Sequence, residues 1–237
     1  MKNNQSTGCL IIHGFGGSAD EVSPLASRLK SKGYKVACPG LLGHTGRRSD
    51  LKRAGYTDWI KSAERGLVEL MPGCNFVFII GFSMGGLIAV NLALKYDIAG
   101  IVTINTPIHY WDVRMILSNI VRGLVGRDFR IIKRYLRATV KFPVSALWNF
   151  RMLLNKTKPM LSDIICPVLI TQGLDDDTVR KSSAKYLFGS ISSEIKRMKF
   201  YGNSGHVMLH SPAAGNVIRD IEEFLEMSQS KNRCHRL

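Results

Sequence analysis

The chain has 237 residues, of which 45% are hydrophobic, and a formal net charge of +15. Its sequence lacks a signal-peptide pattern and any run of roughly 18 apolar residues that would span a membrane. Its five cysteines are scattered without C-x-x-C spacing, which excludes a disulfide framework or zinc site and favours a cytoplasmic protein with reduced, mostly buried thiols and no metal.

Short apolar runs alternate with helical patterns through the first half of the chain. The expected elements are a strand at Gly8–Ile12, a helix at Ala19–Ser31, a strand at Lys35–Ala37, a helix at Asp58–Leu70, a strand at Asn75–Ile80, a helix at Met84–Lys95 and a strand at Ile101–Ile104. Such alternation predicts a parallel sheet in an α/β domain. The length indicates one such domain that carries an insertion.

The first expected strand ends in the glycine-rich sequence His13-Gly14-Phe15-Gly16-Gly17. A turn of this kind can direct backbone N–H groups inward, where they would stabilise the oxyanion of an acyl-transfer intermediate. We expect His13 to pack and hold this loop rather than take part in chemistry.

The most informative stretch is Gly81-Phe82-Ser83-Met84-Gly85, which lies between an apolar strand pattern and an Ala/Leu-rich helix pattern. In this setting G-x-S-x-G is typical of a nucleophile elbow, in which a strained turn lifts the serine above the sheet. The alternative is an ordinary glycine-rich turn. In such an elbow the oxyanion donors are the backbone N–H groups of the residue after the nucleophile, Met84, and of one residue in the first loop, Phe15.

A catalytic serine of this type needs an acid and a base that follow it in the order Ser, Asp, His. A strand at Pro167–Thr171 opens into a turn with three aspartates, and a strand at Lys196–Tyr201 is followed by a small-residue turn with His206. We therefore predict His206 as the general base. Composition does not choose among the three aspartates, Asp175, Asp176 and Asp177, because each could also cap a helix or face solvent.

The motifs HGFGG, GFSMGG, QGLDDDTV and SGHV together resemble the α/β-hydrolase family of small bacterial carboxylesterases and monoacylglycerol lipases, from about Gly8 to Met227. The resemblance implies a mostly parallel sheet with helices on both faces and a helical cap. It places the orienting acid at Asp176, the base at His206 and the loop donor at Phe15. The family pattern does not match His210, and His44 and His109 are interpreted as loop or pocket-lining residues.

The alternation breaks at residues 107–160, which we interpret as a helical cap inserted into a core of residues 1–106 and 161–227. Amphipathic stretches at 113–125 and 129–140 would lie over Ser83. Most of their apolar side chains are expected to pack against the core and a minority to line an acyl slot. The side chains proposed for the slot are Ile116, Ile120, Leu124, Phe129, Leu136 and Trp148. The last expected helix is Ala213–Met227, followed by a flexible tail at 228–237.

Positive charge is concentrated in the cap, where residues 107–160 hold eleven Lys/Arg and two Asp. This charge favours either an anionic membrane surface or an anionic ester, and a solvated helix face is the alternative. No nucleic acid is expected as a partner, because the basic residues lack an aromatic platform or a known binding motif.

These features together predict a serine carboxylic-ester hydrolase that forms an acyl-enzyme on Ser83 and needs no cofactor. Its expected substrates are short- to medium-chain acyl esters or monoacylglycerols. An acyltransferase or thioesterase with the same triad, or a non-catalytic binding protein on the same fold, are the alternatives, and the oligomeric state is left open.

Overall fold

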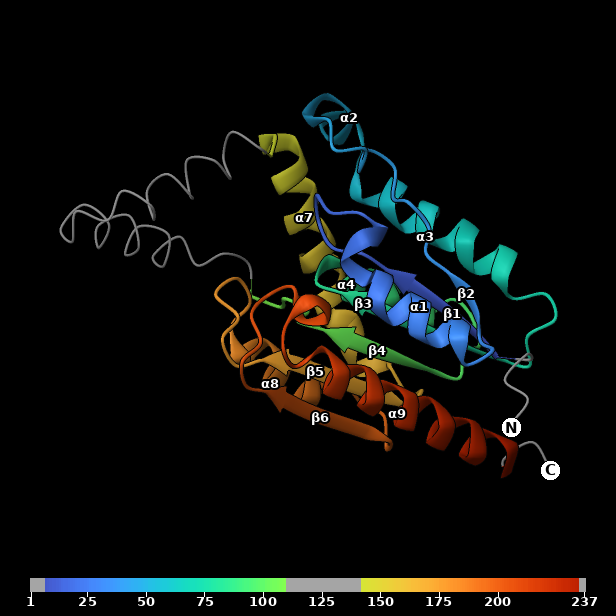
Figure 1. The fold of residues 1–237 in the computed structure, drawn as a ribbon. Helices are drawn as coiled ribbons and strands as arrows, with labels where there is room; N and C mark the ends of the chain where they lie inside the picture. Colours follow the sequence, from blue (N-terminus) through green and yellow to red (C-terminus); the bar gives the residue numbers. More distant parts are fainter. Residues whose placement is uncertain (1–6, 110–141, 235–237) are drawn as a thin grey trace.

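The computed structural model describes residues 7–109 and 142–234 of the chain. Six parallel strands form one sheet in the order β2-β1-β3-β4-β5-β6, with helices on both faces (Figure 1). The strands are β1 (Thr7–Ile12), β2 (Lys35–Ala37), β3 (Phe76–Phe82), β4 (Gly100–Ile104), β5 (Val168–Gly173) and β6 (Lys196–Tyr201). The predicted parallel sheet with helices on both faces is confirmed.

Helices and short 3-10 turns connect these strands. The α-helices are α1 (Ser23–Ser31), α2 (Arg48–Arg53), α3 (Tyr56–Leu70), α4 (Met84–Ala93), α7 (Val144–Thr157), α8 (Lys181–Ser190) and α9 (Ala214–Cys234). The 3-10 turns are η2 (Ala19–Val22), η3 (Lys158–Asp163) and η4 (Met208–His210).

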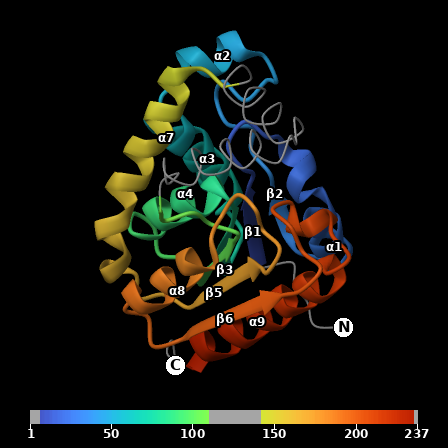
Figure 2. The same ribbon diagram turned by 90° about the vertical axis from the view of Figure 1, so that its left-hand side faces the viewer.

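Side chains alternate across the sheet, so each strand contributes to two separate cores. Leu10 and Ile12 of β1 pack with α3, α4, α7 and α8, whereas Cys9 and Ile11 pack with α1, η4 and α9. The turned view in Figure 2 shows these two helical layers on opposite sides of the strands. Both faces of β3 and β4 are therefore covered. A functional site is expected in the loops at the carboxyl ends of the strands.

Two predicted helices differ from those observed. The expected helix Ala19–Ser31 is divided into η2 and α1, because Pro24 has no N–H and is accommodated only in the first turn of a helix. The last helix runs to Cys234 instead of stopping at Met227, and it buries Ser228 completely.

Residues 142–160, the larger described part of the predicted cap, lie against the core. Phe150, Leu153 and Leu154 of α7 are buried in the same core as α3 and α4. The amphipathic stretches 113–125 and 129–140 and the pocket residues Ile116, Ile120, Leu124, Phe129 and Leu136 lie outside the described residues.

The expectation of mostly buried thiols is wrong for the described cysteines. Cys9 is buried, but Cys38, Cys74 and Cys166 are partly exposed, and all four are free. Within the ranges 7–109 and 142–234, the helices are either too short or too polar to cross a membrane.

Candidate active site

Ser83 lies at the sharp turn between β3 and α4, with backbone angles φ 51° and ψ −119°. A non-glycine residue held at positive φ is strained, and such strain is concentrated at functional sites. Glycines make the turn possible. A Cβ on Gly81 would lie 2.3 Å from the carbonyl of Gly85, and one on Gly85 would lie 2.2 Å from the carbonyl oxygen of Ile12.

The turn at Ser83 is hydrogen-bonded to the neighbouring strand and is followed directly by a helix. The Ser83 N–H donates to the carbonyl of Ile104, at the end of β4, at 2.8 Å. Met84 is the first residue of α4, and the first N–H groups of a helix have no intrahelical acceptor. The amino end of α4, with its partial positive charge, therefore directly follows Ser83.

The glycine-rich loop after β1 is tightly packed. Gly16 has φ 67°, and a Cβ there would lie 2.2 Å from the Phe142 ring. The Phe15 ring stacks on Phe150 with ring centroids 5.4 Å apart and meets Trp59 edge-on at 5.6 Å. The side chain of Phe15 is thus fixed by aromatic contacts, which restrain the backbone N–H that sequence analysis proposes as an oxyanion donor.

His13 holds this loop, as predicted. Its Nδ1 donates to the carbonyl of Gly14 at 2.9 Å, and its Nε2 accepts from the Leu41 N–H at 3.4 Å. The ring must therefore be neutral, and burial lowers its pKa in agreement with that. His44 packs edge-on against His13, and burial together with the nearby His13 lowers the pKa of His44 to about 4.

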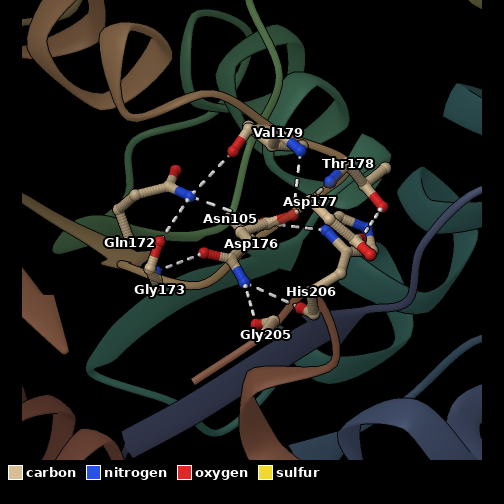
Figure 3. A network of polar contacts seen from close by, with 9 residues as sticks. All are labelled: Asn105, Gln172, Gly173, Asp176, Asp177, Thr178, Val179, Gly205 and His206. Atoms are coloured by element: carbon tan, nitrogen blue, oxygen red, sulfur yellow. Dashed lines mark hydrogen bonds and ion pairs between the residues drawn. The ribbon is translucent and has the colours of Figure 1, made fainter. Parts of the chain in front are cut away.

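Asp176 and His206 form a direct pair, with His206 Nδ1 2.9 Å from Asp176 Oδ2 (Figure 3). The Asp176 side chain is fully buried. Its other oxygen, Oδ1, accepts from the backbone N–H groups of Thr178 and Val179, each at 2.8 Å. These bonds fix the carboxylate, and a His206 that donates from Nδ1 keeps the lone pair of Nε2 available as a base.

The structure separates the three adjacent aspartates. Asp175 accepts from the Ser204 N–H at 3.2 Å, and Asp177 accepts from the Thr178 hydroxyl at 3.1 Å. The carboxylate of Asp176 is the one hydrogen-bonded to His206 in the described bonds. Gln172 adds a weak bond from Nε2 to Asp176 at 3.4 Å.

Asn105 is a site residue that the sequence analysis missed. It follows β4 at φ 47°, and its Oδ1 accepts from the Gly173 N–H at 2.7 Å. Its Nδ2 donates to the carbonyls of Gly205 and His206, at 3.0 and 2.7 Å (Figure 3). Asn105 therefore joins the end of β5, three residues before Asp176, to the loop that carries His206. The available signal was an asparagine at the carboxyl end of an apolar strand.

The remaining predicted residues lie around this centre. The His206 ring lies 5.2 Å from the ring of Phe82, the residue before Ser83. His210 donates from Nε2 to the backbone carbonyl of Asp20, so it is engaged away from Asp176. His109 packs edge-on against Tyr186. Trp148, expected in the acyl slot, is 59% exposed on α7.

Comparisons with known proteins agree with this geometry. A model described as the alpha/beta hydrolase family matches residues 9–216. A thermostable monoacylglycerol lipase from a Bacillus species is 33% identical over 213 residues, which cover 86% of this chain and 84% of that protein. A carboxylesterase from Bacillus subtilis is 25% identical over 224 residues, covering 92% and 91%. One solved structure, from a study of the metagenome-derived lipolytic enzymes LipS and LipT, has a TM-score of 0.79 at 21% identity and covers 94% of this chain and 95% of its own.

Proposed function

This chain belongs to the alpha/beta hydrolase family, and from that premise we propose that it is a serine carboxylic-ester hydrolase with Ser83 as nucleophile. The observation that carries the proposal is the Asp176–His206 pair, 2.9 Å apart, in which the carboxylate is buried and the imidazole lies 5.2 Å from the ring of Phe82, the residue before the strained Ser83. A fixed carboxylate, an imidazole and a serine at one end of a sheet are the parts that acyl transfer requires.

The proposed reaction has two halves. The Ser83 oxygen attacks the ester carbonyl while His206 Nε2 takes its proton, and the ester C–O bond then breaks as that proton passes to the departing alcohol. Water next loses a proton to His206 and attacks the acyl-enzyme, which releases the carboxylic acid and restores Ser83. Asp176 holds the imidazole in the required tautomer and stabilises the imidazolium in both halves.

The backbone N–H groups of Met84 and Phe15 are the proposed oxyanion donors. Met84 opens α4, and Phe15 lies in the glycine-rich loop, whose conformation is held by His13 and by aromatic contacts. Donors fixed in advance stabilise the negative charge without reorganisation, and losing one such donor typically costs about 3–4 kcal/mol.

Monoacylglycerols and short- to medium-chain acyl esters are the proposed substrates. The Bacillus relative at 33% identity is named a monoacylglycerol lipase, and the second relative a carboxylesterase. Acyl transfer to another acceptor and thioester hydrolysis use the same catalytic groups, so they are outcomes of the substrate test. The cytoplasmic location expected from the sequence stays a prediction.

A covalent probe and a substrate panel test the proposal. A fluorophosphonate should label the wild type and the control Ser162→Ala, a serine exposed on η3, but not Ser83→Ala. Monoacylglycerols and nitrophenyl esters from butyryl to palmitoyl, with acyl thioesters and added alcohol acceptors, would identify the substrate class. A folded wild type that neither reacts with the probe nor cleaves any ester would contradict the proposal.

We also propose that α7 binds an anionic lipid surface. Val144, Trp148 and Met152, spaced every fourth residue on one stripe of α7, are 79%, 59% and 40% exposed. Arg151 lies 5.9 Å from the Trp148 ring centroid, and Lys156 follows on the same helix. Tryptophan favours the membrane interface, and each nearby Lys or Arg adds about 1 kcal/mol toward anionic lipid.

Vesicle co-sedimentation tests this surface. Trp148→Ala should weaken binding to all vesicles, whereas Arg151→Gln with Lys156→Gln should weaken binding only to vesicles that contain phosphatidylglycerol. Lys185→Ala, on the exposed side of α8, is the matched control and should bind like the wild type. Equal binding of the wild type to neutral and anionic vesicles at low salt would contradict the role of charge.

A further inference from the structure

The 3-10 turn η2 carries an acidic residue that contacts the glycine-rich loop. Glu21 Oε2 accepts from the Gly14 N–H at 3.0 Å. We propose that Glu21 is a positioning residue that fixes this loop so that the next N–H, of Phe15, is directed at the oxyanion. The proposal rests on the function proposed above and adds a residue outside the triad to it.

Two glycines of the loop leave space for the Glu21 carboxylate. A Cβ on Gly17 would lie 2.1 Å from Glu21 Oε2 and 2.4 Å from Oε1, and a Cβ on Gly14 would lie 3.2 Å from Oε2. Gly17 does not have positive φ, so its backbone conformation alone does not require glycine. The carboxylate thus gives a physical reason for a glycine at position 17.

The turn that carries Glu21 is itself fixed at both ends. Ser18 caps η2 by accepting from the Asp20 N–H at 3.3 Å, and the Ser23 hydroxyl donates to the Asp20 carbonyl at 2.9 Å. The same carbonyl accepts from His210 Nε2 at 2.9 Å. Because His210 ends η4, which begins two residues after His206, η2 connects the oxyanion loop to the segment that carries the proposed base.

Two N–H groups of the loop, those of Gly14 and Gly17, have acceptors within the protein. The Gly14 N–H is used by the carboxylate, and the Gly17 N–H is used by the Gly14 carbonyl at 3.3 Å. The turn between Gly14 and Gly17, which contains Phe15, is thus held by a hydrogen bond at each end. A loop held in this way places its N–H donor before the substrate arrives, which is the condition for strong oxyanion stabilisation.

Three variants separate this role from a general effect on folding. Glu21→Gln keeps an oxygen that accepts from Gly14, and Glu21→Met keeps the volume without an acceptor. Gly17→Ala displaces the carboxylate from the opposite side of the contact without changing Glu21. Glu69→Gln, on the exposed face of α3, is the control for loss of a carboxylate.

We expect Glu21→Met and Gly17→Ala to lower kcat at least tenfold with KM changed less than threefold, and Glu21→Gln and Glu69→Gln to stay within fivefold of wild type. Affinity for a trifluoromethyl ketone, which forms an oxyanion on the serine, should fall in parallel with kcat. Circular dichroism identifies any variant that fails to fold, and the remaining variants then decide. Wild-type kcat in a folded Glu21→Met or Gly17→Ala, or an equal loss in Glu21→Gln, would overturn the inference. Absence of wild-type esterase activity would instead refute the proposed function.

Discussion

Replacing Asn105 by glycine should weaken the connection between the proposed base, His206, and its proposed orienting acid, Asp176. Asn105 has φ 47°, a conformation that glycine adopts without strain, so the variant removes the side chain and leaves the backbone free to keep its shape. The exchange removes the bond from the Gly173 N–H and the two bonds to the carbonyls of Gly205 and His206.

The magnitude follows from these three bonds. A hydrogen bond contributes about 1 kcal/mol net, so about 3 kcal/mol of coupling between the end of β5 and the His206 loop is lost. If the transition state uses all of this coupling, kcat/KM falls about 100-fold, since each 1.4 kcal/mol corresponds to about tenfold. Conformational stability should also fall, because the glycine adds freedom to the unfolded chain.

The assay is kcat/KM for a nitrophenyl ester together with the rate constant for labelling of Ser83 by a fluorophosphonate. Both depend on the base, so both should fall together. The matched control is Asn203→Gly, an exposed asparagine at φ 53° in the loop before His206. It makes the same exchange at the same backbone conformation and should keep wild-type rates. A folded Asn105→Gly within fivefold of wild type would refute the coupling role.

Three further predictions address the proposed acid, the partly buried His44 and the predicted cap. Asp176→Asn should lower kcat about 10⁴-fold in ester hydrolysis, because an amide does not hold His206 in the required tautomer; activity within tenfold of wild type would contradict the assignment. His44 has a pKa lowered from 6.5 to about 4, so the unfolded chain binds a proton that the folded chain does not. The contribution of neutral His44 to the free energy of unfolding is therefore fully present above pH 6.5, and it falls toward pH 4 by up to about 1.4 kcal/mol per pH unit. The free energy of unfolding of His44→Phe, measured by urea denaturation, should decline less over this range. Leu124→Trp or Leu136→Trp should shorten the preferred acyl chain in the ester panel, and an unchanged preference would argue against an acyl slot in the cap.

The sequence predicted the elements that local patterns determine. The strand before Ser83, the glycines around it and the helix after it are adjacent in the chain, and the requirement for Gly81 and Gly85 is set by atoms of the turn and of β1. The boundaries were less accurate. The division of the expected helix Ala19–Ser31 follows from Pro24, a local signal that the prediction passed over. The extension of α9 to Cys234 depends on packing that the polar sequence around Ser228 does not indicate.

The choice among the three aspartates illustrates a different limit. All three follow β5, and composition treats them alike. The structure distinguishes them because the backbone N–H groups of Thr178 and Val179 close onto one carboxylate only, that of Asp176. A resemblance in spacing found the same residue, but the physical reason is a turn whose geometry depends on the whole segment after β5.

Strand order explains why Asn105 escaped prediction. The proposed nucleophile follows β3, the proposed acid follows β5 and the proposed base follows β6, so β4 lies between the first and the other two. The end of β4 therefore bonds to both sides of the site. The Ile104 carbonyl accepts from the Ser83 N–H, and the Asn105 side chain accepts from the Gly173 N–H and donates to the His206 carbonyl. This adjacency exists only after the sheet has formed, because residues 104 and 205 are far apart in the chain. Alignment of a triad across a sheet therefore depends on a strand that contributes no catalytic residue, and substitutions at its end should change rate more than they change substrate binding.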